Sequence, residues 1–332
     1  MKKIKKFLLS LKVKLNKVYK TIKLKISKIN KRKIKKFFFG TKDKYGFIYN
    51  LIIYGLLIII SFIYLYPLLY MISGSLMDIS DMQNPTVYFV PTKFYLDNYR
   101  IAFEKLDYFK VLFSSLLFTV LPSLFQTISI SIIAYGFARF KFPLRKLFFA
   151  LSLITYVIIP QITMLPKYML FSNFHMVGNI LSFIIPATTG QGLNSAIFLL
   201  IFYQFYRLIP IQLEESAEID GASKFKTFYL ITLPLVKPAI ISSFLFSLVW
   251  YWNETYISDL FLGNKAKDST LQLRFLRFAS QFNETGADYL MREFEGARLA
   301  AMLVVIIPLI IVYVILQRKF VEGIDAKGLG GE

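Results

Sequence analysis

The feature that most constrains this chain is a charge-free apolar run at residues 45–77, YGFIYNLIIYGLLIIISFIYLYPLLYMISGSLM. It exceeds the roughly 20 apolar residues that cross a bilayer as a helix. Because the bilayer core offers no water to backbone N–H and C=O groups, such a segment must satisfy its own hydrogen bonds, as an α-helix does. The composition agrees with a membrane protein, since 56% of the residues are hydrophobic and only 18% are charged.

Further apolar runs recur along the chain, and together they predict an all-α integral membrane protein with six transmembrane helices. None of them alternates between apolar and polar residues as a β-barrel strand does. Five runs lack charge, whereas the fifth in order contains acidic residues, among them Glu254. The predicted domain covers residues 47–320. Its spans are expected at about residues 48–72, 111–138, 147–167, 180–206, 238–262 and 299–317.

The distribution of lysine and arginine predicts the orientation, because these residues are enriched in cytoplasmic loops. If the N-terminus is cytoplasmic, the inside segments hold 29 of the 40 Lys and Arg residues. Both termini are therefore predicted to be cytoplasmic. The inside segments are residues 1–46, 139–146, 207–237 and 318–332.

The N-terminal extension, residues 1–46, holds 18 Lys and Arg against one acid, a net +17 of the chain's +20. Its apolar residues recur every three or four positions, which indicates a basic amphipathic helix. Such a helix suits the anionic lipid of the inner leaflet. A solvated tail, or a segment that binds RNA or a protein, is the alternative. Nucleic acid is disfavoured because no aromatic stacking platform accompanies the lysines.

The residue inventory excludes several kinds of site. The chain has no cysteine and a single histidine, His175, so thiolate metal sites, disulfides and histidine clusters are excluded. It has no glycine-rich phosphate-binding motif. The apolar runs hold no paired carboxylates for catalysis, and no arginine-repeat sensor or filter-like loop of an ion channel. We therefore expect no catalytic residue, metal or cofactor in this chain.

An acidic stretch, EESAEIDGAS, occupies Glu214–Ser223 in the cytoplasmic loop before the fifth span. The preceding residues favour helix, with Leu213 and Ala217 on one side. Gly221 permits a left-handed turn, and Ser223 can cap a second helix. The stretch therefore predicts a short helix, a glycine turn and a second helix.

The spacing in this loop resembles the EAA loop of ABC importer permeases. That pattern is Glu-Ala-Ala, three residues, Gly, nine residues, Ile, one residue and Leu-Pro. Every spacing fits, and the one departure is serine for the first alanine. The residues that carry the match are Glu215, Ser216, Ala217, Gly221, Ile231, Leu233 and Pro234.

The resemblance extends over residues 47–330 and is closest to the second permease of carbohydrate importers, the maltose-type subunit. The lysine-rich extension is not part of the family pattern, and Ser114-Ser115 stands where an Asn-Ser pair is common. The supporting segments are residues 91–103, 131–143, 198–223, 247–256 and 317–332.

The resemblance implies a type I ABC importer permease fold in a bacterial cytoplasmic membrane. The loop at 207–237 would be the coupling loop, docking into a cleft on a cytoplasmic ATPase. Glu215 would pair with a basic ATPase residue, Ala217 would pack in the cleft, and Gly221, beside Asp220, would let the hairpin turn. The cytoplasmic tail at 321–332 is a further candidate contact with the ATPase, and a flexible, glycine-rich end is the alternative.

The implied partners are a homologous permease, two ABC ATPases that bind the ATP, and an extracytoplasmic solute-binding protein. The implied cargo is a sugar or oligosaccharide. The coupling loop is shared by importers of peptides, amino acids and ions, so these remain alternatives, and a six-span channel is a weaker one.

Polar residues on one face of the predicted fifth span mark a candidate translocation path, because an aromatic ring and a carboxylate suit a sugar surface. Packing between helices, or a place in the interfacial aromatic belt, is the alternative. Bonding to neighbouring helices is expected of the other intramembrane polar residues, Gln126, Gln161, Asn194 and Gln204. The residues of the candidate face are Ser243, Ser247, Trp250, Glu254 and Ser258, with Asn253 beside them.

Overall fold

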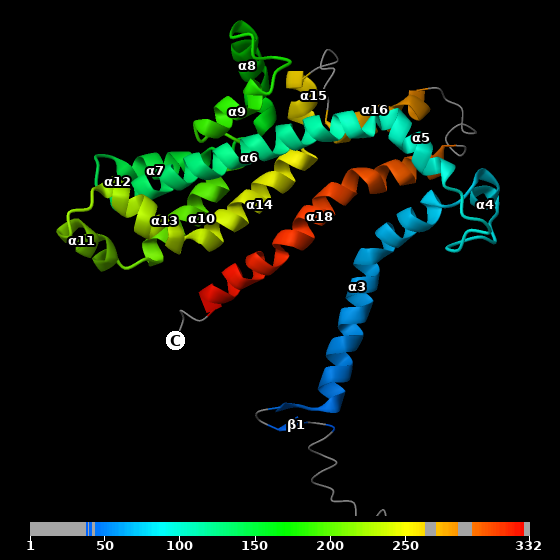
Figure 1. Ribbon diagram of the computed structural model, residues 1–332, viewed down its shortest axis with the longest axis horizontal. Coiled ribbons are helices and arrows are strands. Elements are labelled where there is room, and N and C mark those ends of the chain that lie inside the picture. Colours follow the sequence, from blue (N-terminus) through cyan, green and yellow to red (C-terminus); the bar gives the residue numbers. More distant parts are fainter. Residues whose placement is uncertain (1–37, 39, 42–43, 263–269, 285–293, 329–332) are drawn as a thin grey trace, which may run out of the picture. The chain divides into compact units, whose positions relative to one another are not determined.

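A computed structural model describes residues 38, 40–41, 44–262, 270–284 and 294–328 (Figure 1). Helices make up nearly all the regular structure of these residues, so the all-α prediction is confirmed. The chain divides into two compact units, residues 1–70 and 71–332. The predicted amphipathic extension lies almost entirely outside the described residues.

The described part of the first unit is a short β pairing and most of one long helix. Strand β1 (Gly40–Thr41) pairs antiparallel with β2 (Lys44–Tyr45). Helix α3 (Phe47–Ser75) follows, and none of the residues in its most apolar window is buried. An apolar surface on every side of a helix is typical of a membrane span. The predicted first span therefore forms one continuous helix.

The described part of the second unit is built mainly of helices. They are α4 (Ile79–Gln83), α5 (Asp97–Leu106), α6 (Tyr108–Arg139), α7 (Arg145–Ile154), α8 (Pro160–Asn173), α9 (Leu181–Thr188), α10 (Ser195–Leu208), α11 (Ile211–Ile219), α12 (Lys224–Thr227), the π-helical turn η1 (Phe228–Thr232), α13 (Leu233–Leu235), α14 (Lys237–Asn253), α15 (Tyr256–Leu262), α16 (Leu271–Glu284) and α18 (Glu295–Gly328).

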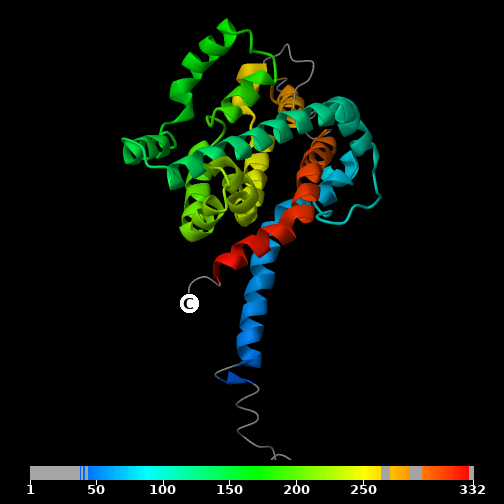
Figure 2. The same ribbon diagram turned by 60° about the vertical axis from the view of Figure 1, so that its left-hand side comes forward.

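Helix α6 is the central element of this unit. It packs against α9, α10 and α14 along its length and against α5 and α16 near its first residues (Figures 1 and 2). Small hydroxyl side chains recur every fourth residue on its buried face, and small residues let membrane helices approach closely. They are Ser115, Thr119, Ser123, Thr127 and Ser131.

Two further predicted spans are also long apolar helices, α6 and the part of α18 up to Gln317. Helix α18 continues to Gly328, so much of the predicted C-terminal tail is helical. The predicted third span is interrupted in the structure, because residues 155–159 separate α7 from α8. Pro160 begins α8, and Ile159 before it is extended (φ −61°, ψ 123°), as the residue before a proline prefers.

The fourth and fifth predicted spans are also interrupted. Residues 189–194 separate α9 from α10, with Gly190 at φ +76° and Asn194 at φ +52°. Helix α14 ends at Asn253, Glu254 is extended, and α15 follows, so the predicted fifth span is not one continuous helix.

Among the described residues, three helices alone are long and apolar enough to cross a membrane. The number rises to five if two bent pairs each count as one span. In the first pair α10 meets α11 at 68°, and in the second Lys224–Leu235 meets α14 at 76°. The count of six spans and the cytoplasmic placement of both termini stay predictions.

Candidate functional site

The acidic loop folds as a helical hairpin, as predicted. Helix α11 ends in a left-handed turn at Gly221 (φ +85°). The amide of Gly221 donates to the Glu218 carbonyl (3.0 Å), and that of Ala222 to the Ala217 carbonyl (2.9 Å). This pair of bonds is the Schellman arrangement that closes a helix C-terminus. An added Cβ at Gly221 would meet nothing within 4 Å, so the backbone conformation alone requires glycine here.

The second arm of the hairpin also begins as predicted. The Ser223 hydroxyl accepts a hydrogen bond from the Lys226 amide (3.3 Å) and caps α12. A π-helical turn, η1, follows directly, although the sequence pattern predicts an ordinary helix here. Turns of this kind are rare and frequently lie at functional positions.

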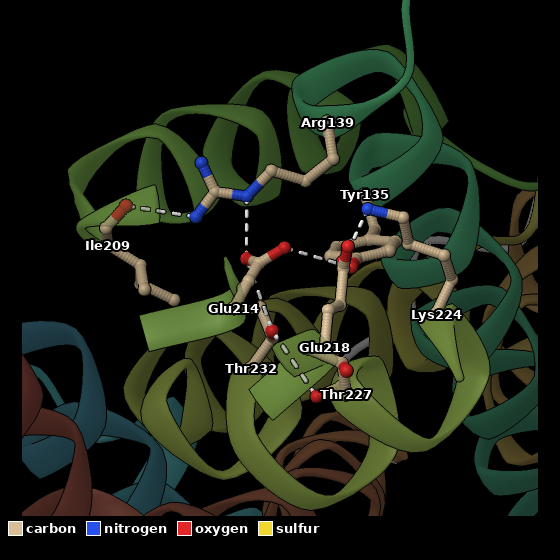
Figure 3. Close-up of polar contacts among 8 residues, drawn as sticks. All are labelled: Tyr135, Arg139, Ile209, Glu214, Glu218, Lys224, Thr227 and Thr232. Carbon is tan, nitrogen blue, oxygen red and sulfur yellow. Dashed lines mark hydrogen bonds and ion pairs between the residues drawn. The ribbon is translucent and has the colours of Figure 1, made fainter. Parts of the chain in front are cut away.

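The centre of the hairpin base is Glu214, whose side chain the sequence analysis passed over (Figure 3). Glu214 is 4% exposed. Its Oε1 accepts from Arg139 Nε at 2.6 Å, and its Oε2 accepts from the Tyr135 hydroxyl at 3.1 Å. The Thr232 hydroxyl donates to Oε1 at 3.3 Å. Four residues from α6, α11 and η1 thus meet at one carboxylate, and we call them the Glu214 cluster.

Arg139 extends the cluster to the connection between α10 and α11. Its Nη2 donates to the Ile209 carbonyl at 2.9 Å (Figure 3). The side chains of Arg139 and Glu214 are 10% and 6% exposed. A buried charge is costly unless it is paired and hydrogen-bonded, and this ion pair meets both conditions. It therefore fixes the hairpin base against the last turn of α6.

Apolar packing surrounds the cluster and positions it. The Tyr135 ring lies 4.6 Å from the Phe228 ring and 5.4 Å from that of Tyr206. The Tyr206 and Ser131 hydroxyls are hydrogen-bonded at 2.6 Å. The hairpin base and the end of α6 thus share one buried core. Its members are Ile130, Ala134, Tyr135, Phe198, Leu199, Phe202, Tyr206, Phe228, Val236 and Ala239.

The structure divides α11 into a buried and an exposed face. Glu214 and Ala217, three positions apart, face inward, whereas Leu213, expected on the same side as Ala217, is exposed. The prediction for Leu213 is wrong because the burial of Glu214 turns the helix by about one residue. Glu215, Ser216 and Asp220 are exposed.

Large apolar side chains accompany these exposed polar groups on the hairpin. Ile219 is 86% exposed and Phe225 is 76% exposed. Glu218 and Lys224 form an ion pair across the hairpin mouth. A cavity of about 150 Å³ lies beside them and is also lined by Glu215 and Arg139. Exposed apolar residues among acids are typical of a surface that binds another protein.

The three remaining residues that match the EAA pattern lie near the second bend. Ile231 and Leu233 are partly buried in η1 and α13, and Pro234 is exposed. Pro234 is the second residue of α13, which directly continues η1. These residues form the arm that leads from the hairpin to α14.

The candidate path residues do not share one helical face, because α14 ends at Asn253 and Ser258 belongs to α15. Glu254 Oε1 accepts from the Ile257 amide (2.6 Å) and so caps the start of α15. Asn253 bonds the Val249 carbonyl of its own helix (3.0 Å). A role of these residues in translocation stays a prediction.

The inner part of that face is packed against neighbouring helices. Ser243 and Ser247 are fully buried, and the Trp250 ring lies 5.0 Å from the Phe198 ring. The Ser247 hydroxyl donates to Gln126 Oε1 at 3.3 Å. Gln126 Nε2 in turn donates to the Leu193 carbonyl at 2.6 Å. The expected role of Gln126 in bonding between helices is confirmed.

The fold and the hairpin define a class of protein, a helical membrane subunit with a folded, exposed hairpin between two bent helices. Residues 44–325 match the family described as binding-protein-dependent transport system inner membrane component. Because the match spans most of the chain, this protein belongs to that family.

Individual relatives of the chain are also transport permeases. The chain is 29% identical to the polygalacturonan/rhamnogalacturonan transport system permease YtcP of Bacillus subtilis over 83% of this chain and 96% of that protein. It is 29% identical to AmyC of Thermoanaerobacterium thermosulfurigenes, a probable starch degradation products transport system permease, over 71% of this chain and 81% of that protein. It is 30% identical to GgtD of Synechocystis, an osmoprotective compounds uptake permease, over 86% of this chain and 94% of that protein.

A solved structure shows the same fold. It is that of a bacterial ABC transporter involved in the import of the acidic polysaccharide alginate, with a TM-score of 0.68 and 22% identity over 82% of this chain and 96% of that chain. The predicted permease fold is confirmed. The chain is a permease subunit of a bacterial ABC importer in the cytoplasmic membrane, and this class works with a second permease, ATPases and a solute-binding protein.

Proposed function

We propose that this subunit helps to import sugars or oligosaccharides by alternating access, driven by two ATPase subunits that bind its hairpin. The observation that carries the coupling role is the hairpin itself, a rigid turn at Gly221 with an exposed acidic and apolar face. The relatives named above favour a carbohydrate cargo, although GgtD is named for osmoprotective compounds. A peptide, amino acid or ion remains the alternative cargo.

The exposed face specifies the partner surface. Glu215 and Asp220 present carboxylates beside the exposed Ile219 and Phe225, so we propose a basic-rimmed apolar cleft on the ATPase. In this arrangement Glu215 pairs with the partner's cation and Ser216 lies beside it. Ala217 is buried within this chain, so in place of the expected packing in the ATPase cleft we assign it to the inner side of the hairpin, where its carbonyl closes the turn.

The remaining roles follow from the same proposal. The arm with Ile231, Leu233 and Pro234 leads from the docked hairpin toward α14. ATP is bound by the partner subunits, and this chain needs no cofactor and catalyses no reaction of its own. We further propose that residues 1–46 attach to anionic lipid, because 18 basic residues stand against one acid.

The test of the coupling role is co-isolation from native membranes. An affinity tag on this chain should recover an ABC ATPase and a second permease. Glu215→Lys should reduce the recovered ATPase, because it puts a cation against a basic rim, while the second permease is still recovered. If the membranes contain the ATPase and the chain is recovered without it, the proposal is contradicted.

The cargo is tested separately with the solute-binding protein of the same transporter. Its melting temperature is measured with neutral oligosaccharides, with oligogalacturonides and with a mixture of amino acids and short peptides. We expect stabilisation by a saccharide. Stabilisation only by the amino acid and peptide mixture overturns the carbohydrate assignment and leaves the importer assignment intact.

A further inference from the structure

The Glu214 cluster joins parts of the chain that are distant in sequence, since Arg139 and Glu214 stand 75 positions apart. We propose that this cluster makes the coupling hairpin and α6 one rigid unit, so that α6 carries hairpin movement across the membrane. The proposal rests on the proposed coupling function and assigns Tyr135, Arg139, Glu214 and Thr232 as positioning residues.

The covalent connections of the hairpin are poorly suited to this task. Helix α10 meets α11 at a 68° bend, and the second arm meets α14 at a 76° bend. At such bends the ladder of i→i−4 hydrogen bonds is interrupted, as it is at Pro210, which has no N–H. Two bent junctions therefore separate the hairpin from its sequence neighbours, whereas the buried side chains of the cluster bind it directly to α6.

The bonding within the cluster explains why this attachment is stiff. Both carboxylate oxygens of Glu214 are occupied, and the Arg139 guanidinium binds both Glu214 and the Ile209 carbonyl. Because the ion pair is nearly excluded from water, neither charge can leave its partner and be solvated without opening the core. The hairpin base and the last turn of α6 must then move together.

Helix α6 has a specific contact at its other end. The amide of Leu271, the first residue of α16, donates to the Ser115 hydroxyl at 2.7 Å. At 1.5 Å per residue, the 24 residues from Ser115 to Arg139 correspond to about 36 Å. That length exceeds the roughly 30 Å of the hydrocarbon core. One continuous helix thus connects the hairpin on one side to α16 on the opposite side.

The experiment uses two introduced cysteines, which are unique because the chain has none. Ile219→Cys marks the hairpin and Phe109→Cys marks the far end of α6; both native side chains are more than three-quarters exposed. The assembled transporter, with cysteine-free partners, is spin-labelled in nanodiscs. The distance distribution is measured by pulsed electron spin resonance without nucleotide and with ATP and vanadate. We expect one narrow peak that is the same in both states.

Variants of the cluster then test its role. Arg139→Leu and Glu214→Gln should lose the single peak in the ATP and vanadate state, while ATP hydrolysis continues. The matched control is Asp97→Asn, which breaks the exposed Asp97–Arg100 ion pair (3.1 Å) and should keep the peak. The double variant Arg139→Leu/Glu214→Leu removes both charges and guards against misfolding, since apolar replacement of a buried pair is well tolerated. It should assemble normally and still lose the peak.

The outcomes distinguish a failure of the rigid-unit proposal from a failure of the coupling function on which it rests. A wild-type distance that changes between the states, or a single peak retained by every cluster variant, overturns the rigid unit. A double variant with the wild-type peak shows that the ionic bonds are not required and overturns the assignment of the charged residues. Failure of the wild-type subunit to assemble with an ATPase refutes the coupling function and therefore this inference as well.

Discussion

Replacing Gln126 tests how the broken fourth span is held in place. The Gln126 side chain is fully buried and makes three hydrogen bonds, to the Leu193 carbonyl, to the Ser195 hydroxyl and from the Ser247 hydroxyl. Gln126→Met keeps an unbranched side chain of similar size and removes all three. The carbonyl of Leu193, in the interrupted segment at 189–194, then loses its 2.6 Å partner inside the protein.

The magnitude follows from which groups lose a partner. A buried polar group without a partner costs about 1–3 kcal/mol. Ser195 still donates to the Gly192 carbonyl, so the loss of its hydrogen bond with Gln126 adds little to this cost. We expect Gln126→Met to lower the free energy of unfolding by about 1–3 kcal/mol, a 5- to 150-fold change in the equilibrium constant. Ser247→Ala removes only the 3.3 Å bond, and such bonds between membrane helices average about 0.6 kcal/mol.

The assay is SDS-induced unfolding of the purified chain in mixed micelles. Tryptophan fluorescence is a suitable probe, because the two tryptophans of the chain, Trp250 and Trp252, lie on α14 close to Ser247. The double variant should lose less stability than the sum of the losses in the two single variants, since the two residues share one hydrogen bond. A Gln126→Met loss no larger than that of Ser247→Ala, or strict additivity, would refute this account.

Three further predictions concern other positions. Gly221→Ala should weaken the hairpin by about 1–2 kcal/mol, the usual cost of a left-handed residue, and lower ATPase recovery; recovery equal to wild type would show that the turn tolerates a side chain. Gly192→Ala should lower the melting temperature, since the added Cβ would lie 2.6 Å from both Gln126 Oε1 and the Tyr251 hydroxyl. Gly136→Ala, where an added Cβ meets nothing within 4 Å, should not lower it. Equal melting curves for the two variants would contradict the packing described at Gly192. Deletion of residues 2–36 should weaken binding of detergent-solubilised protein to anionic vesicles but leave the transporter assembled; unchanged vesicle binding would eliminate the lipid role.

The sequence alone determined the helical character of this protein and the local form of its coupling hairpin. Long apolar runs must form helices in a bilayer because the backbone has no other partner there. The hairpin was equally predictable, since a left-handed residue such as Gly221 and a cap such as Ser223 depend on only a few neighbouring residues. The family resemblance rested on the same local spacing.

The interruptions of the predicted spans were less accessible to sequence analysis. Pro160 signals a possible break, but whether a proline kinks a helix or ends it depends on what packs around it. The end of α14 at Asn253 has no proline or glycine to mark it. Helical periodicity therefore placed Glu254 and Ser258 on one face with Ser247, although Glu254 is extended and caps the next helix.

Only the tertiary structure decided which acid of the hairpin faces inward and what it binds. Glu214 and Glu215 are adjacent and chemically alike, and the spacing pattern drew attention to Glu215. Burial of Glu214 depends on Arg139 and Tyr135, which reach it from 75 and 79 positions away. Local preferences act over a turn or two of chain, whereas the pairing of a buried charge is set by the elements that exclude water from it.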